Sequence, residues 1–297
     1  DLLGAVLAAS DAPVLLAPAM NQAMWRDART QKNVTTVLDS GIRFIGPDSG
    51  SQACGDTGPG RMSEPTQIAA AAAELFDTGS LNGRHVVITA GPTREPIDPV
   101  RYLSNASSGK MGFAIAQAAI DAGAKVTLIS GPVHLTTPDR VERIDVVTAE
   151  DMLNASRNAA KHCDVFIACA AVADFRPRSI ATEKIKKTPN SDDVPNIELI
   201  RNPDILATIT SEFPTLYSVG FAAETNNVIE FARDKRTRKG LAMIVANDVS
   251  RQDVGFNADE NEATLITDNT EHFISKCSKA QLARQLVAQI AGALHGN

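Results

Sequence analysis

Short apolar runs alternate with amphipathic stretches along most of the chain, and this alternation predicts strands and helices in turn. A nearly continuous apolar run at residues 164–171 (DVFIACAA) is typical of a central parallel strand, buried on both faces. Thr148 and Asp151 form a variant of the capping box before one helix. Further strands are expected at residues 85–89, 125–130, 141–147, 217–222 and 243–246, and helices at 111–122, 148–161 and 279–294. The pattern predicts an α/β fold with a doubly wound, Rossmann-like parallel sheet.

The beginning of the chain carries a shorter version of the same pattern. Residues 13–18 (PVLLAP) predict a buried strand that runs into a polar loop. Residues 33–40 predict a helix closed by Gly41, followed by a short strand at 43–45. This region is expected to be the tail of an α/β sheet.

A segment rich in glycine, serine and proline follows at residues 46–65. Its length and polarity suit a functional flap, but a plain surface loop has the same composition. An alanine-rich helix is expected at residues 66–76, and the DTGSLNG stretch after it is typical of a domain boundary. We therefore expect two domains, residues 1–77 and 78–297.

Composition narrows the class of protein. The 297 residues are 43% hydrophobic and 22% charged, which suits well-buried cores and excludes a disordered chain. The net charge of −6 argues against a mainly nucleic-acid-binding role. Apolar stretches such as residues 68–75 fall short of the roughly 18 residues of a membrane span. The four cysteines form no CxxC pair, so we expect reduced thiols in a soluble, cytoplasmic protein. Because residue 1 is Asp and an apolar helix follows at once, we expect a fragment of a longer chain.

Polar sequences follow the predicted strands: AGPTREP, SGPV, AAVADF, GFAAETNN and ANDVS. Ligands of doubly wound sheets bind beyond the carboxyl ends of the strands, so the chemistry is expected there. Asp174 suits a ribose hydroxyl, a base amine or a metal, but also a simple turn cap. Residues 202–205 (NPDI), and Asn247 with Asp248, leave the same choice open.

Residues 104–112 (SNASSGKMG) join a polar turn to a helix start, where backbone N–H groups can hold a phosphate or carboxylate. The segment is neither a Walker motif nor a GxGxxG fingerprint. Helix capping explains it about as well. The Asn105 amide suits a hydrogen bond to a substrate carbonyl or phosphate, although a turn-forming asparagine is the plainer explanation.

Two basic clusters stand out in this acidic protein. Lys184, Lys186 and Lys187 lie within EKIKK, here called the lysine segment, which suits a strap over polyphosphate or an ordinary solvated surface. Lys235 and Lys239 are four residues apart and are expected on one helical face. Together the clusters favour a nucleotide ligand.

Two residues of the first domain are candidates for chemistry. Cys54 lies in the glycine-rich segment beside Asp56 and Arg61, where an exposed thiol suits a proton donor or is merely tolerated. Asn21 follows the predicted strand that ends in PAM. No histidine precedes residue 85, so this region supplies no histidine base.

Several long motifs in one order resemble a known family. PAMNQAMW and ACGDTGPGRMSEP are similar to the flavin-dependent decarboxylase domain of the bifunctional phosphopantothenoylcysteine decarboxylase/phosphopantothenate–cysteine ligases of bacterial coenzyme A biosynthesis. ITAGPTREPIDPVRYLSNASSGKMG, AAVADFRP, EKIKK, GFAAETNN and ANDVS resemble its ligase domain. The resemblance covers essentially the whole chain, so we expect part of a flavodoxin-like domain before a complete ligase domain.

The resemblance implies a ligase that joins 4′-phosphopantothenate to cysteine with CTP and Mg²⁺, through an acyl-cytidylate, releasing CMP and pyrophosphate. It implies roles for Asn105 and Lys184 in the chemistry, but assigns no magnesium ligands. It places the nucleotide at Ala168, Cys169, Ala170, Asp174, Lys184, Pro203, Asp204, Ile205, Leu206, Phe221, Lys235 and Lys239. It places phosphopantothenate and the acyl-cytidylate at Asn105, Ser108, Gly109 and Lys110.

For the decarboxylase, the resemblance implies FMN chemistry, with Cys54 as proton donor and Asn21 holding the substrate carboxylate. The family's amino-terminal half of that domain, with a catalytic histidine and most FMN contacts, is missing from this sequence. We therefore expect no decarboxylase activity from this chain, although a full-length parent would have it. The resemblance also implies a ligase dimer, and decarboxylase trimers in the full protein.

Two other classes of protein compete with this interpretation. A dinucleotide-binding oxidoreductase also uses a doubly wound sheet, but the glycine fingerprint is absent. Bound nicotinamide absorbance would favour it. A noncatalytic scaffold would have no use for the lysine segment, and CTP-dependent turnover would exclude it.

Overall fold

The computed structural model describes residues 2–10, 12–52, 55–75, 79–186, 195–224, 227–248 and 258–295. The chain forms two compact units, Asp1–Asp77 and Thr78–Asn297. Within these described ranges, no helix combines the length and apolar character that crossing a membrane requires.

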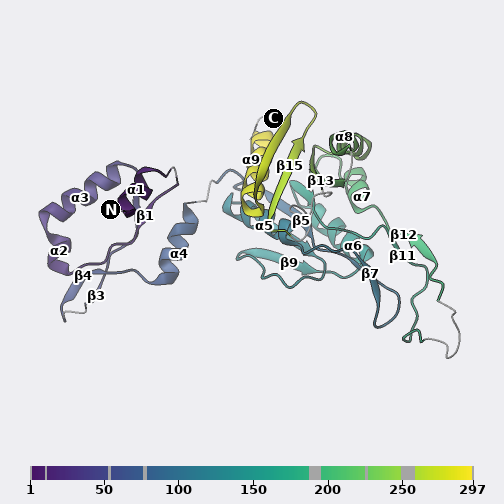
Figure 1. Cartoon of the computed structure of the whole chain (residues 1–297), viewed down its shortest axis with the longest axis horizontal. Coiled ribbons are helices and arrows are strands. Elements are labelled where there is room, and N and C mark those ends of the chain that lie inside the picture. The colour runs from purple at the N-terminus through teal and green to yellow at the C-terminus, as the bar shows by residue number, and fades with distance from the viewer. Residues whose placement is uncertain are drawn as a thin grey trace. The chain divides into compact units, whose positions relative to one another are not determined.

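The first unit is built from short elements (Figure 1). Strands β1 and β2 form a two-residue parallel pair, and β3 and β4 form an antiparallel hairpin. A reciprocal cap between Glu64 and Gln67 opens the alanine-rich helix α4, with a proline at its start. The elements are α1 (Leu2–Ala8), β1 (Leu15–Leu16), α2 (Gln22–Arg26), α3 (Ala28–Asp39), β2 (Arg43–Phe44), β3 (Asp48–Ser51), β4 (Thr57–Arg61) and α4 (Pro65–Glu74).

Three expectations for this unit differ from the structure. The buried strand expected at residues 13–18 is reduced to Leu15 and Leu16, which are half-buried, because prolines flank the apolar run closely on both sides. The helix expected at residues 33–40 begins earlier, at Ala28, because the Asp27 side chain caps it by accepting a hydrogen bond from the Arg29 N–H. The segment at 46–65 contains the β3–β4 hairpin rather than continuous loop.

The second unit is organised around an eight-stranded sheet in the order β16-β15-β14-β13-β10-β5-β8-β9. The six strands from β14 to β9 are parallel, which confirms the doubly wound prediction, and β10 lies near the centre. Strands β15 and β16 extend the sheet beyond β14 and were not predicted: β15 pairs antiparallel with β14, and β16 pairs antiparallel with β15. The strands are β5 (His85–Ala90), β8 (Lys125–Ser130), β9 (Val141–Asp145), β10 (Val165–Ala168), β13 (Tyr217–Glu224), β14 (Met243–Asp248), β15 (Glu260–Ile266) and β16 (Glu271–Ser278).

Helices cover both faces of this sheet (Figure 1). Helices α5 and α9 pack together on one face, over alternate strand residues such as Val86 and Ile88. The residue between them, Val87, points to the other face, into a core shared with α6, α7 and α8. The predicted capping box of Thr148 and Asp151 is present at the start of α6. The helices are α5 (Lys110–Asp121), α6 (Ala149–Ala160), α7 (Ile205–Glu212), α8 (Val228–Lys239) and α9 (Lys279–His295).

Two small hairpin-like pairs stand beside the main sheet. Strands β6 (Arg94–Pro96) and β7 (Tyr102–Ser104) pair antiparallel, as do β11 (Phe175–Pro177) and β12 (Leu199–Arg201). Each follows a carboxyl end of the main sheet, β5 for the first pair and β10 for the second. They therefore extend the edge at which ligands were expected to bind.

Close contact between α5 and β5 depends on Gly112. A Cβ atom at this position would lie 2.5 Å from Ala90 Cβ and 3.2 Å from Ala90 Cα, nearer than packed atoms approach. We expect Gly112→Ala to lower the free energy of unfolding by about 1–3 kcal/mol, because the helix must move off the strand. At Gly292 in α9, nothing beyond the helix's own backbone and the adjoining residues lies within 4 Å of the Cβ position. Gly292→Ala should instead stabilise by about 0.5–1 kcal/mol. Chemical denaturation measures both, and equal effects would contradict this packing argument.

Candidate functional site

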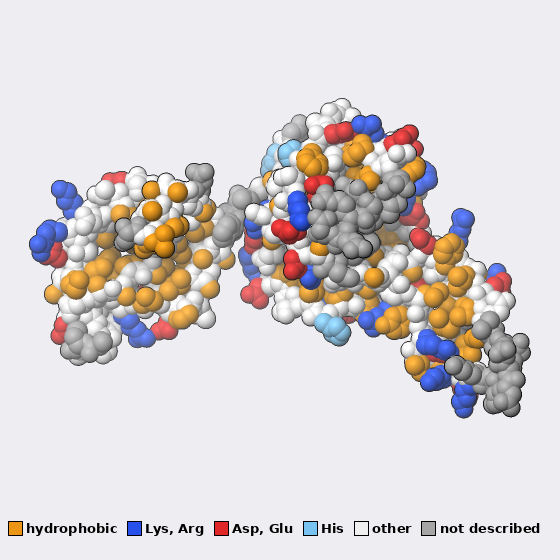
Figure 2. Space-filling view, in the orientation of Figure 1, with side chains coloured by type: hydrophobic (Ala, Val, Ile, Leu, Met, Phe, Trp, Pro, Cys, Tyr) orange, Lys and Arg blue, Asp and Glu red, His pale blue; other side chains and the backbone are white. Residues whose placement is uncertain are grey.

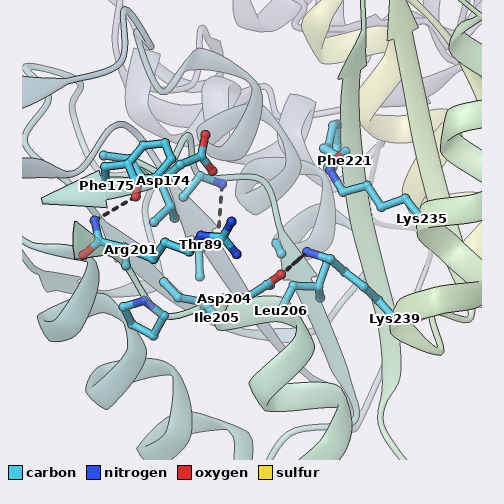
Figure 3. A pocket seen from close by; sticks show the side chains of 16 residues that line it. Thr89, Asp174, Phe175, Arg201, Asp204, Ile205, Leu206, Phe221, Lys235 and Lys239 are labelled. Carbon is cyan, nitrogen blue, oxygen red and sulfur yellow. Dashed lines mark hydrogen bonds and ion pairs between the residues drawn. The ribbon is translucent and has the colours of Figure 1, made fainter. Parts of the chain in front are cut away.

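Two adjoining cavities lie at the carboxyl ends of the central strands. The first, of about 550 Å³, is shown in Figure 3. Ten of the twelve residues predicted to bind nucleotide line it. They are Ala168, Ala170, Asp174, Pro203, Asp204, Ile205, Leu206, Phe221, Lys235 and Lys239. Ala168 and Lys239 are 71 positions apart in the chain, and the fold brings them together because the loops after β10, β12 and β13 meet at one edge of the sheet.

Asp204 and Lys239 form an ion pair on the wall of the first cavity (Figure 3). Lys239 Nζ lies 2.6 Å from Asp204 Oδ2, and the Asp204 side chain also caps α7 by accepting a 3.0 Å hydrogen bond from Ala207 N–H. Burial of the Asp204 carboxyl raises its pKa, but the bonds from Lys239 and Ala207 and the charge of Lys235 outweigh burial and lower the pKa. Asp204 is thus both the turn cap and a charged wall residue.

Lys235 stands between the two cavities and lines both. Its ammonium group donates a 2.8 Å hydrogen bond to the carbonyl oxygen of Phe221, at the strand β13 below it. Lys235 and Lys239 lie one turn apart on α8 and both face the first cavity, which confirms the prediction of a shared helical face. This pair places two positive charges beside one space.

The second cavity, of about 390 Å³, opens at the start of α5. Asn105, Gly109, Lys110 and Cys169 line it, together with residues of the first cavity that include Ala170 and Phe221. Gly109 caps the helix with φ +78°, a conformation that glycine adopts without strain. The N–H groups and positive end of a three-turn helix therefore face this space.

Asn105 fastens the loop before α5 to the loop after β10. Its Nδ2 donates 3.1 Å hydrogen bonds to the carbonyl oxygens of Ala171 and Val172. The neighbouring Ser108 lines a third cavity of about 450 Å³, which Asn105 also lines. Lys110 forms a 2.6 Å ion pair with Asp259, and this pairing lowers the pKa of the Asp259 carboxyl. The predicted substrate residues therefore line two different cavities: Gly109 and Lys110 line the second, Ser108 lines the third, and Asn105 lines both.

Cys169 lines the second cavity rather than the first. Burial raises the pKa of its thiol to about 12, against a smaller opposing effect of Lys279. A thiol that stays protonated at neutral pH is a weak nucleophile. Cys169 therefore contributes to the wall of the second cavity.

Lys184 is not among the residues that line the first or the second cavity. The backbone beside it is held firmly: Ile185 N–H donates to Asp98 Oδ2 at 3.1 Å, and Arg101 Nη2 donates to the Ile185 oxygen at 3.0 Å. The Arg101 guanidinium holds the pKa of the Asp98 carboxyl well below its usual range. Lys184 and Lys186 are exposed on either side of this anchor, and Lys187 lies outside the described residues. A role for Lys184 stays a prediction.

In the first unit, Asn21 caps α2, since its Oδ1 accepts a 2.7 Å hydrogen bond from Ala23 N–H. Its Nδ2 donates to Asp56 Oδ2 at 3.1 Å, which links α2 to the connection between β3 and β4. Cys54 belongs to that connection but lies outside the described residues. The proposed acid and carboxylate roles of these two residues remain predictions.

Sequence reasoning missed several wall residues. Thr89, Phe175 and Arg201 line the first cavity, and Asn261 and Lys279 line the second. Thr89 was hidden inside a predicted strand, although its Oγ1 accepts a 3.2 Å hydrogen bond from Ala170 N–H at the cavity. Phe175 and Arg201 lie on the small β11–β12 pair, and no clear periodicity in the sequence predicted these two strands.

Across the described ranges, no three His, Cys, Asp or Glu side chains gather as a metal centre. Asp174 and Asp204 nevertheless line the first cavity. Mg²⁺ in nucleotide sites is commonly held by one or two carboxylates with phosphate oxygens and waters. The donor set therefore suits a magnesium ion that arrives with a polyphosphate.

Comparison with known proteins places these features in context. Residues 81–294 match the family model of the DNA/pantothenate metabolism flavoprotein C-terminal domain, and residues 2–77 match the flavoprotein model. The chain is 53% identical to the coenzyme A biosynthesis bifunctional protein CoaBC of Haemophilus influenzae, over 98% of this chain and 72% of that protein. It is 49% identical to the protein of the same name from Escherichia coli, with the same coverage. A solved CoaBC C-terminal domain superposes with a TM-score of 0.63 at 39% identity, covering 74% of this chain and all of that one.

Proposed function

Since this chain belongs to the family of bifunctional coenzyme A biosynthesis proteins, we propose that its second unit joins 4′-phosphopantothenate to cysteine in a CTP-dependent reaction. The carboxylate first attacks the α-phosphorus of CTP, and the bond to pyrophosphate breaks. The cysteine amine then attacks the acyl carbon of the acyl-cytidylate, a C–N bond forms, and CMP leaves with the electron pair of the broken C–O bond. The amine proton passes to water.

The observation that carries this proposal is the pair of cavities with a common wall. Ala170, Val172, Phe221 and Lys235 line both. A nucleotide in the first cavity and an acid in the second would therefore meet across this wall, as acyl transfer through a nucleotidyl intermediate requires. A protein that bound one nucleotide as an effector would have no need of the second space.

The positive charges suit the first step. An anionic carboxylate must approach an anionic triphosphate, so fixed cations that offset the growing charge accelerate the reaction. Lys235 and Lys239 supply such charge from α8, and the start of α5 supplies partial positive charge from the other cavity. Mg²⁺, held by phosphate oxygens with Asp174 or Asp204, would supply further charge neutralisation.

Asn105 and the lysine segment complete the proposal. Asn105 is held against Ala171 and Val172 and so lies at the wall between acid and nucleotide. There its amide would orient the acyl group of the substrate and of the acyl-cytidylate. We assign Lys184 to the triphosphate during cytidylate formation, which requires the segment anchored at Ile185 to approach the cavity during the reaction.

A second copy of the chain is part of the proposal. Orange side chains gather over β11 and β12 in Figure 2, where Phe175, Ile180, Ile197 and Leu199 are exposed. Exposed apolar surface of this kind is typical of an interface. A ligase dimer that covers these residues is consistent with the resemblance of the sequence, and decarboxylase trimers are proposed for longer members.

For the first unit we propose a part in FMN-dependent decarboxylation of phosphopantothenoylcysteine, giving 4′-phosphopantetheine in a longer parent chain. The match of residues 2–77 to the flavoprotein family supports this. Asn21, whose Nδ2 donates to Asp56, would hold the substrate carboxylate, and FMN would supply the oxidation of the cysteinyl thiol. Cys54 would return the proton.

Pyrophosphate release tests the ligase directly. The assay uses the purified chain with 4′-phosphopantothenate, Mg²⁺ and either CTP or ATP, with and without cysteine. We expect release with CTP before cysteine is added, CMP when it is added, and none after Mg²⁺ is chelated. Release with ATP alone would overturn the nucleotide assignment. No release with either nucleotide would favour a binding scaffold, and bound nicotinamide would favour an oxidoreductase.

A further inference from the structure

Part of the second cavity is built by elements that no motif predicted. Asn247 comes from β14, Asn261 from the antiparallel strand β15, and Lys279 from the first position of α9. These three residues, here called the amide-lysine cluster, lie on different elements from Asn105, Gly109 and Lys110. The cavity therefore has lining groups beyond those assigned to the acid and the nucleotide.

Lys279 is a buried cation of this cluster. The residue is 6% exposed, and its Nζ donates a 2.5 Å hydrogen bond to the Ala258 oxygen. Its backbone N–H donates to the Asp259 oxygen at 3.0 Å, so the side chain is fixed at the start of α9. Burial and the charge of nearby Lys110 lower its pKa. Burial and the charge of Lys110 thus both disfavour the charged form of Lys279, and an anionic group bound in the cavity would stabilise that form.

Asn247 offers the complementary group. Its Oδ1 is buried, and among the residues that the structure describes it has no hydrogen-bond partner. Buried polar atoms are normally satisfied, so such an oxygen is suited to a donor brought by a ligand. Asn261 is also buried, at 3% exposed, and its Oδ1 accepts a 3.0 Å hydrogen bond from Glu262 N–H. The cluster thus joins a fixed cation to a fixed acceptor in one cavity.

These groups match the two ends of an α-amino acid. A carboxylate requires a cation, and an amine requires an oxygen that accepts its N–H. We propose that the amide-lysine cluster binds the cysteine substrate, with its carboxylate at Lys279 and its amine at Asn247. This inference rests on the proposed function, and it adds where the second substrate binds. The amine would then lie in the same cavity as Asn105 and the acyl group it attacks.

Separating the two half-reactions tests this assignment. Lys279→Met is expected to raise KM for cysteine at least tenfold, while pyrophosphate release without cysteine changes much less. Lys279→Arg, which keeps the charge, should recover part of the loss. Lys276→Met is the matched control, because it removes a nearby positive charge from the exposed strand β16 outside the cavity. It should leave KM for cysteine as in the parent.

Cysteamine, which has the amine and thiol of cysteine but no carboxylate, identifies the group that Lys279 recognises. The unsubstituted chain should prefer cysteine to cysteamine, and Lys279→Met should lose most of that preference. Asn247→Ala should raise KM for cysteine and for cysteamine by similar factors. This variant also tests the assignment if Lys279→Met does not fold. An unchanged KM for cysteine in both folded variants, or equal losses of cysteine and cysteamine in Lys279→Met, would overturn the assignment. No pyrophosphate release by the parent would instead overturn the proposed function itself.

Discussion

Replacing Lys235 by methionine is expected to lower CTP-dependent turnover about 100-fold, the size of effect seen when one group that stabilises transition-state charge is removed. Lys235 lines both cavities, and its hydrogen bond to Phe221 fixes its ammonium group between them. Its charge would therefore act on the triphosphate at the point where the carboxylate attacks. Methionine keeps much of the apolar length of the side chain and removes the charge.

The control for this variant comes from the same helix. Arg238 lies on α8, is exposed, and is not among the residues that line either cavity. Arg238→Met changes the net charge of the protein by the same amount, so it should retain turnover within about twofold if position matters. Steady-state pyrophosphate release gives kcat/KM for both variants. Equal losses of kcat/KM in the two variants would show a general electrostatic effect and would contradict a specific role for Lys235 in the site.

Asn105→Asp is expected to reduce ligation by a factor of about 100 to 1,000, because it removes a donor and adds a charge. The substitution is almost isosteric. The Nδ2 that now donates to Ala171 and Val172 becomes a carboxylate oxygen, which repels both carbonyls and any anionic substrate. We expect the acyl-cytidylate to form poorly, or to persist without reacting.

The control for Asn105→Asp is the same Asn-to-Asp change at an exposed position of a helix. Asn154 of α6 is exposed and is not among the residues that line either cavity. Asn154→Asp should retain turnover, and the melting temperatures of the two variants show whether Asn105→Asp has simply unfolded the unit. A folded Asn105→Asp variant with parental turnover would mean that the amide has no part in the reaction.

The parallel core could be predicted from the sequence because its strands are buried on both faces. The run at residues 164–171 contains β10, but the strand itself ends at Ala168. The remaining small residues, Cys169, Ala170 and Ala171, form cavity wall instead of strand. Hydrophobicity alone does not distinguish these two uses of an apolar residue.

The antiparallel extension could not be predicted in the same way. Strand β15 (ENEATLI) begins with charged and polar residues, and one of its buried positions is Asn261. Lys279 is likewise buried, although lysine is among the residues that are most often exposed. Their burial is set by tertiary packing, so Asn261 and Lys279 gave no signal in the sequence.

The nucleotide wall was predicted residue by residue through the resemblance of its motifs. The residue pattern alone indicated that Lys235 and Lys239 share a helical face, and that Asp174 follows a buried strand. It did not indicate that the Asp204–Lys239 ion pair links α7 to α8, because such a contact depends on how the helices pack. It gave no account of the Ile185 anchor at Asp98 either.

Oxygen transfer tests the central claim most directly. The chain is supplied with 4′-phosphopantothenate whose carboxylate carries ¹⁸O, with CTP, Mg²⁺ and cysteine, and the products are analysed by mass spectrometry. If the second unit forms an acyl-cytidylate, one labelled oxygen passes from the carboxylate to CMP. CMP formed without label, or label found in pyrophosphate or inorganic phosphate, would contradict the proposed reaction.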